Sequence, residues 1–109
     1  MHTEYDKNLY YYPEKSGLEI VAQVDYSSGN YEFDYRVVWR NLETKMLLTA
    51  RDEGRSCPTP FEEFFLESLE PVNLDELRRE VMEQVTSIYE LISMEKGQEF
   101  LRTVELAMK

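Results

Sequence analysis

The sequence contains a single cysteine, Cys57, and a single histidine, His2, in 109 residues. A lone cysteine cannot form an intrachain disulfide, which is typical of proteins in a reducing cytoplasm. Zinc and calcium sites need several ligands at short spacings, and nucleophilic catalysis needs a base beside the thiol. These scarcities predict a cytoplasmic protein with no metal, no cofactor and no catalytic residue.

Long apolar stretches and basic residues are also scarce. Val37–Trp39 and Phe64–Leu66 are runs of three residues, far below the roughly 18 residues of a membrane span. Residues 1–13 lack the basic start and apolar block of a secretory signal. Twelve Lys and Arg stand against 22 Asp and Glu, a net charge of −10. Because nucleic acids and anionic lipids bind clustered basic residues, we expect no direct nucleic-acid binding and no membrane association.

The apolar content, 42% with 13% aromatic residues, suffices for one folded core. We expect a single domain, 1–109, with an N-terminal arm at 1–16, a β-meander at 17–52, a proline-containing elbow with a short helix at 53–72, and a helical part at 73–109. The predicted fold class is α+β: a three- to four-stranded antiparallel meander followed by two to three helices packed on one sheet face.

Apolar residues alternate with polar ones through the meander, which is the period of a β-strand. Leu18 to Tyr26, Tyr31 to Trp39 and Met46 to Ala50 show this alternation. We predict that Phe33, Tyr35, Val37 and Trp39 lie on one side of the central strand, against the helices. We expect Tyr10–Tyr12 either to add a short fourth strand, which Pro13 limits to an edge position, or to pack across an edge of the sheet.

Helix signals fill the second half. Thr59, Pro60 and Glu62 together predict a short helix that begins at a Thr59 cap and runs to about Leu69. Asn73 caps a predicted longer helix, and Gly97 interrupts the helical pattern before a last helix from about Gln98. The apolar stripes of these two helices are Leu74, Leu77, Val81, Val85, Ile88 and Ile92, then Phe100, Leu101, Val104, Ala107 and Met108. Because two amphipathic helices share one small sheet, we also expect a homo-oligomer or an exposed apolar surface.

The string Ser56-Cys57-Pro58-Thr59-Pro60-Phe61-Glu62, together with the upstream segment 17–40, resembles a group of small acidic proteins encoded by actinobacteriophages. The resemblance covers about half of the chain, from Gly17 to Phe64. It implies a bacteriophage protein that works in the cytoplasm of a host cell, and it implies no particular activity. Typical members carry a second cysteine where this chain has Arg55, so a Cys-x-Cys metal or redox pair is not available here.

Two sharper hypotheses concern the thiol and the acidic residues. Cys57 precedes a predicted helix start, which could lower its thiol pKa, but a small buried residue is the more common role of a free cysteine. Residues 52–83 carry ten acids and three bases. A rigid array of carboxylates could mimic the phosphates of a nucleic acid and inhibit a host DNA- or RNA-binding protein. The spacing of Asp75, Arg79 and Glu83 at i, i+4 equally suits an ordinary solvated helix.

Aromatic residues are more numerous than one small core needs, and tyrosine is enriched at binding hot spots. At least one of Tyr10, Tyr11 and Tyr12 should be exposed, because an extended chain cannot turn all three inward. We therefore predict a non-enzymatic phage accessory protein that binds a host or phage protein, with nucleic-acid mimicry as the alternative. The candidate interaction residues are Tyr10, Tyr11, Tyr12, Arg55, Cys57, Pro58, Pro60, Phe61 and Glu62.

Overall fold

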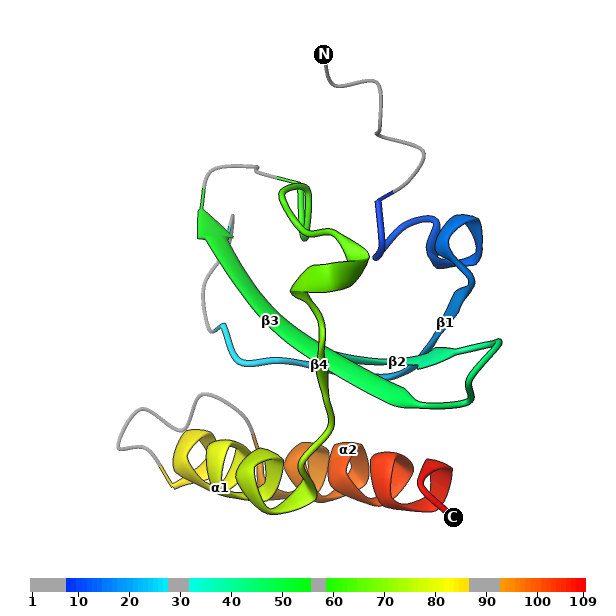
Figure 1. The fold of residues 1–109 in the computed structure, drawn as a ribbon. Helices are drawn as coiled ribbons and strands as arrows, with labels where there is room; N and C mark the ends of the chain where they lie inside the picture. Colours follow the sequence, from blue (N-terminus) through cyan, green and yellow to red (C-terminus); the bar gives the residue numbers. More distant parts are fainter. Residues whose placement is uncertain (1–7, 28–31, 56–58, 87–92) are drawn as a thin grey trace.

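A four-stranded antiparallel sheet organises the chain (Figure 1). The computed structural model describes residues 8–27, 32–55, 59–86 and 93–109. The strands β1 (Leu18–Asp25), β2 (Glu32–Asn41), β3 (Leu47–Arg55) and β4 (Glu70–Pro71) follow one another in space in their chain order. Two helices, α1 (Leu74–Val85) and α2 (Met94–Ala107), cover one face. This arrangement confirms the predicted α+β class.

The sheet is covered on both faces, which the sequence analysis did not foresee. Val38 packs with the helices, whereas Val37 and Trp39 pack with the arm at residues 8–16 and the 59–69 connection; all three side chains are fully buried. Figure 1 shows the arm and the connection on the side of the sheet opposite α1 and α2. The prediction that Phe33, Tyr35, Val37 and Trp39 face the helices was therefore wrong. Their alternation was correct, but a second apolar layer competes for that face.

A β-bulge divides β1 between the two cores. Ile20 pairs with Trp39 and Ala22 pairs with Val38, so Val21 is an extra residue in the ladder. An inserted residue reverses the phase of the side chains beyond it. Leu18 consequently packs on the arm side and Val24 on the helix side. The alternating apolar residues from Leu18 to Tyr26 predicted one buried face, but they are divided between the two cores.

The elbow differs from its prediction. Residues 59–64 form backbone turns, followed by a 3-10 turn η3 (Leu66–Ser68), and no α-helix begins at Thr59. Phe61 has φ 61°, a left-handed conformation that ends any helix, and its N–H donates to Asp52 Oδ2 at 2.8 Å. Thr59 therefore caps no helix, and the prediction of a helix from Thr59 to about Leu69 was wrong. The fourth strand is β4, whereas Tyr10–Tyr12 lie in a turn before the 3-10 helix η2 (Pro13–Ser16).

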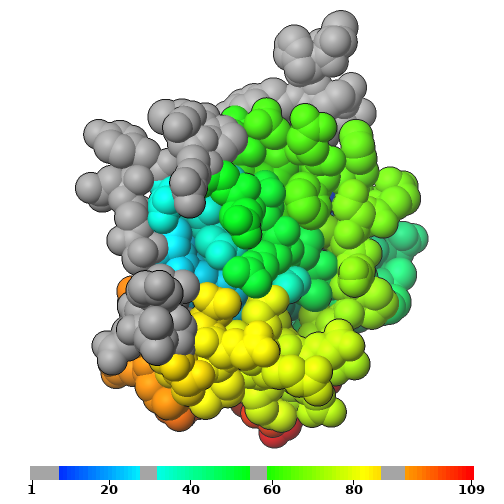
Figure 2. Space-filling view, turned by 90° about the vertical axis from the view of Figure 1, so that its left-hand side faces the viewer, coloured from blue at the N-terminus to red at the C-terminus, as the bar shows by residue number. Residues whose placement is uncertain are grey.

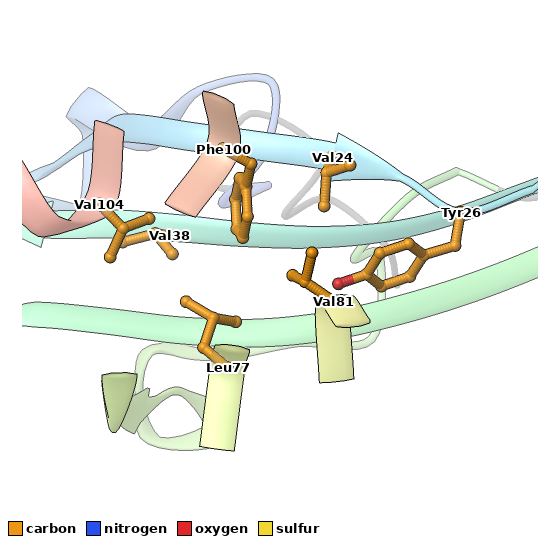
Figure 3. Packing of buried hydrophobic residues seen from close by; sticks show 7 residues of the cluster. All are labelled: Val24, Tyr26, Val38, Leu77, Val81, Phe100 and Val104. Atoms are coloured by element: carbon orange, nitrogen blue, oxygen red, sulfur yellow. The ribbon is translucent and has the colours of Figure 1, made fainter. Parts of the chain in front are cut away.

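The helices have the expected apolar stripes and one unexpected boundary. Asn73 Oδ1 accepts the Glu76 N–H at 3.1 Å, which confirms the predicted cap of α1. Ser93 Oγ accepts the Lys96 N–H and caps α2. The helix begins at Met94, four residues before the predicted start, so Gly97 is a buried residue inside α2 rather than an interruption. Leu77, Val81, Phe100 and Val104 meet Val24, Tyr26 and Val38 (Figure 3). Ile88 and Ile92 lie outside the described residues. No helix among the described residues is long and apolar enough to cross a membrane.

Candidate protein-interaction surface

Four aromatic side chains form a continuous surface that we call the aromatic ribbon: Phe33, Tyr35, Tyr10 and Tyr11. The ring centroids of Phe33 and Tyr35 are 5.1 Å apart, those of Tyr35 and Tyr10 are 5.3 Å apart in a stacked pair, and those of Tyr10 and Tyr11 are 5.2 Å apart, edge to face. Tyr11 is 48% exposed, which confirms that one of the N-terminal tyrosines faces solvent. The other three rings are half-buried.

A buried asparagine fixes the arm that carries two of these rings. Asn8 Oδ1 accepts the N–H groups of Tyr10 and Tyr11 at 2.8 and 2.9 Å, and its Nδ2 donates to the Pro60 carbonyl at 3.0 Å. Only 6% of Asn8 is exposed. A buried amide whose bonds are satisfied holds its neighbours firmly, because each broken bond would leave an unpaired polar group. The turn at Tyr10 and Tyr11 is thus tied to the elbow.

The indole of Trp39 ties the same arm to the sheet. Its Nε1–H donates to the Leu9 carbonyl at 2.9 Å, and both residues are buried. Phe61 packs edge to face against Trp39, with centroids 5.3 Å apart, and stacks on Tyr10 at 5.8 Å. The exposed part of the ribbon therefore stands on a rigid aromatic base. Rigid rings lose little conformational entropy when a partner binds them.

The two central phenols remain neutral at physiological pH. Burial, with a contribution from Tyr35, raises the pKa of Tyr10 above its ordinary value. Burial, with a contribution from Asp25, likewise raises the pKa of Tyr35. A neutral phenol both donates and accepts a hydrogen bond beside an apolar ring. The ribbon can thus contribute apolar contact and hydrogen bonds, but no charge.

The structure places the predicted interaction residues in different environments. Tyr10 and Tyr11 belong to the ribbon, and Tyr12 is half-buried beside it in sequence. Pro60 and Phe61 are buried, so they support the surface from below, whereas Glu62 is exposed. The backbone of Arg55 lies opposite that of Glu32 at the end of the β2–β3 ladder. Cys57 and Pro58 lie outside the described residues.

Sequence reasoning missed two elements of this surface. Phe33 and Tyr35 were expected beneath the helices, although their alternation with Asp34 and Arg36 was visible. The other element is a groove of about 620 Å³ along β1. It runs between the rings of Tyr10 and Tyr35 on one side and α2 on the other, and β1 supplies its floor from Val21 to Asp25. The α2 residues that line it are Lys96, Glu99, Phe100 and Thr103.

A charged cluster joins the helix-covered face of the sheet to α1. Arg36 Nε donates to Glu80 Oε2 at 2.8 Å, and the Tyr26 hydroxyl donates to the same oxygen at 2.8 Å. Arg51 Nε donates to Asp34 Oδ1 at 2.8 Å, and its Nη1 is 3.5 Å from Glu80 Oε1. Here Asp34 and Arg36 face the helices without cost to the fold, because opposite charges satisfy them. Figure 2 shows the side of the molecule where β3, in green, meets α1, in yellow.

The pKa values in this cluster favour its ionised state. Burial tends to raise the pKa of Glu80, but the hydrogen bonds and charge of Arg36, the Tyr26 hydroxyl and the Arg51 charge outweigh it, so the pKa lies below its ordinary value. The hydrogen bond to Asp34 is the main cause that raises the pKa of Arg51. Burial is the main cause that raises the pKa of Tyr26, so its phenol stays protonated. The cluster has two positive and two negative groups, which suits a structural joint better than an ion-binding site.

No group of three or more potential metal ligands occurs within the described ranges.

A model of one protein family, described as domain of unknown function (DUF7574), matches residues 7–109. The chain belongs to this family. No curated protein and no solved structure matches it.

Proposed function

We propose that this member of the family is a non-enzymatic accessory protein of a bacteriophage, which acts by binding a host or phage protein through the aromatic ribbon. The observation that carries the proposal is the fixed position of Tyr10 and Tyr11, whose N–H groups are both held by the buried Asn8. Natural surfaces rarely hold adjoining aromatic rings half in solvent, and such rings are the residues that dominate binding energy at protein interfaces. The resemblance of residues 56–62 to actinobacteriophage proteins supports the phage setting.

The test compares two single substitutions that remove similar amounts of exposed apolar surface. Tyr11 is 48% exposed in the ribbon, and Leu42 is 42% exposed in the turn after β2. Neither residue belongs to the buried cores, so both variants should fold. The protein and each variant would be used to capture partners from a host lysate, and the affinity of any captured partner would then be measured by titration calorimetry.

Tyr11→Ala should weaken the captured complex by about tenfold or more, as loss of a hot-spot residue does. Leu42→Ala should leave the affinity within about twofold of the original value, because scattered surface apolar residues contribute little. Equal effects of the two substitutions would remove the ribbon from the interface and contradict the proposal.

Nucleic-acid mimicry remains the second candidate, because six acids of the elbow and of the first turn of α1 are exposed. They are Glu62, Glu63, Glu67, Glu70, Asp75 and Glu76. Against it, Asp52 and Glu80 of the same region hold internal partners. A mimic would bind a basic partner through these exposed carboxylates, so replacing Glu67 and Glu70 by Gln should weaken its complex, whereas the ribbon complex should keep its affinity. Calorimetric titration of this double variant beside Tyr11→Ala therefore separates the two candidates.

A further inference from the structure

Among the residues that the structure places, no strand pairs with the outer side of β1, which leaves it as a sheet edge. In the part of the chain that the structure describes, β1 is the first strand of the order β1-β2-β3-β4 and pairs only with β2. Its register is regular from Ala22 to Asp25, beyond the bulge. The Tyr26 N–H donates to the Asp34 carbonyl at 2.8 Å. Since inward and outward groups alternate along an antiparallel strand, the backbone N–H and C=O groups of Gln23 and Asp25 point away from β2.

The groove described above lies along this regular part of the edge. Its lining includes every β1 residue from Val21 to Asp25, so the outward backbone groups of Gln23 and Asp25 meet the groove. A strand added beside β1 would lie about 4.8 Å away, and its side chains would alternate between the two walls. One set would meet the rings of Tyr10 and Tyr35, and the other would meet Phe100, Glu99 and Thr103 of α2.

We propose that an extended segment of the partner protein, carrying basic side chains, binds in this groove as a fifth strand beside residues 22–25. This inference rests on the proposed function and names the element of the partner that the surface takes. Main-chain hydrogen bonds to an open edge supply affinity in such complexes, and the walls select the side chains.

Charge decides the chemistry of the segment. Two acidic residues, Asp25 and Glu99, and one basic residue, Lys96, line the groove. The whole chain has a net charge of −10. A basic side chain would also gain from lying over a tyrosine ring, because the face of the ring attracts cations. The segment should therefore present Lys or Arg toward Tyr10 and Tyr35, and a small apolar residue toward Phe100.

A second copy of this chain fits the same edge poorly. Antiparallel pairing of two β1 strands through the outward groups of Gln23 and Asp25 would bring the Asp25 carboxylates of both copies into the same short ladder, and like charges close together on one face destabilise a sheet. Each copy also carries −10, so their approach is repelled. A basic partner segment has neither difficulty.

The probe is a short end-capped synthetic peptide of alternating lysine and valine, with alternating glutamate and valine as its acidic counterpart. Fluorescence anisotropy should show binding of the basic peptide and none of the acidic one. Two further basic peptides carry N-methyl groups on alternate residues, one in each phase. Because only one phase directs its N–H groups to β1, methylation in that phase should abolish binding, and methylation in the other should change it by about twofold or less. Equal effects of the two phases, or equal binding of the two charge types, would overturn the inference.

Three substitutions test the groove from the protein side. Thr103→Trp fills the groove from the exposed side of α2, and Arg102→Trp makes a comparable change at the adjacent exposed residue, which does not line the groove. Thr103→Trp should weaken peptide binding at least tenfold, and Arg102→Trp should not change it. Gln23→Pro removes an outward N–H without removing a β1–β2 bond, so it should also abolish binding in a folded protein. If Gln23→Pro unfolds the chain, the Thr103→Trp and Arg102→Trp pair still decides.

Amide hydrogen exchange gives a direct readout. The amides of Gln23 and Asp25 should exchange more slowly in the peptide complex, and unchanged exchange at both would overturn the inference. The same variants separate it from the proposed function. If Tyr11→Ala lowers the affinity for a captured partner protein and Thr103→Trp does not, strand addition is disproved and the ribbon interface remains supported. A partner affected by neither substitution would disprove both.

Discussion

Glu80 is the residue at which the charged cluster can be tested most sharply. We predict that Glu80→Gln destabilises the protein, because the substitution keeps the side-chain volume and one acceptor oxygen but removes the negative charge. Arg36 would then face α1 without its counter-charge, whereas Arg51 would keep Asp34. The cluster connects β2 and β3 to α1, so loss of the Glu80 charge should weaken the packing of α1 on the sheet.

The magnitude follows from the burial of the pair. The side chains of Arg36 and Glu80 are each 18% exposed. Exposed ion pairs contribute about 0–1 kcal/mol, and removal of one partner of a fully buried pair costs about 3–5 kcal/mol. An intermediate pair with a further hydrogen bond from Tyr26 should therefore cost about 2–3 kcal/mol in the free energy of unfolding. Glu83→Gln, one turn later and exposed on the same helix, should stay within about 0.5 kcal/mol.

The destabilisation should depend on pH in a definite direction. The pKa of Glu80 in the folded protein lies below its ordinary value of 4.5. A lowered carboxyl pKa stabilises the folded state above the ordinary value, and this contribution is lost as pH falls through the folded value. The difference between the original protein and Glu80→Gln should thus be full at neutral pH and shrink below about 4.5. Other carboxyl groups titrate in both proteins and cancel in the comparison.

The assay is urea unfolding followed by circular dichroism, over a series of pH values, for the original protein, Glu80→Gln and Glu83→Gln. A difference that persists unchanged into the acid range would show that the lost charge is not the cause. A Glu80→Gln effect no larger than that of Glu83→Gln would show that the cluster does not stabilise the docking of α1.

Three further predictions concern Trp39, Asn8 and the single cysteine. Trp39→Ala should lower the free energy of unfolding by about 3–5 kcal/mol, because it empties a fully buried site and leaves the Leu9 carbonyl unpaired; a loss below about 1 kcal/mol in urea unfolding would contradict this packing. Asn8→Ala should cost about 1–3 kcal/mol and speed hydrogen exchange at the amides of Tyr10 and Tyr11, and unchanged exchange would show that Asn8 does not hold the ribbon. Cys57→Ser should leave partner affinity unchanged in titration calorimetry, since a lone thiol without a base is not a nucleophile. Loss of binding in a folded Cys57→Ser variant would show that the thiol takes part in the function.

Local periodicity was enough to identify the three long strands and the two helices. Period-two alternation and 3.6-residue stripes reflect the geometry of each element, and the cap at Asn73 needs only its own first turn. The exposure of one N-terminal tyrosine was also predicted correctly, although Tyr10–Tyr12 lie in a turn and not in the extended segment on which the prediction was based.

The tertiary structure decided which face of the sheet each element covers. Alternation says that two sets of side chains point in opposite directions, and it does not say which set meets the helices. The run Val37–Trp39 was the available signal for burial on both faces, since a strand with one solvated face has polar residues at every second position. The bulge at Val21 then moved half of β1 to the other core, and a one-residue insertion leaves no mark in composition.

Local sequence rules could not predict the conformation of the elbow or the interaction surface, because both depend on contacts between distant residues. Thr59, Pro60 and Glu62 do favour a helix start, but Phe61 gains more by packing on Trp39 and Tyr10 with its N–H held by Asp52. The ribbon and the groove bring together residues of the arm, β1, β2 and α2 that are distant in sequence. Sequence determined the elements because their hydrogen bonds and stripes are local, and only the fold could determine the surfaces, because these arise where separate elements meet.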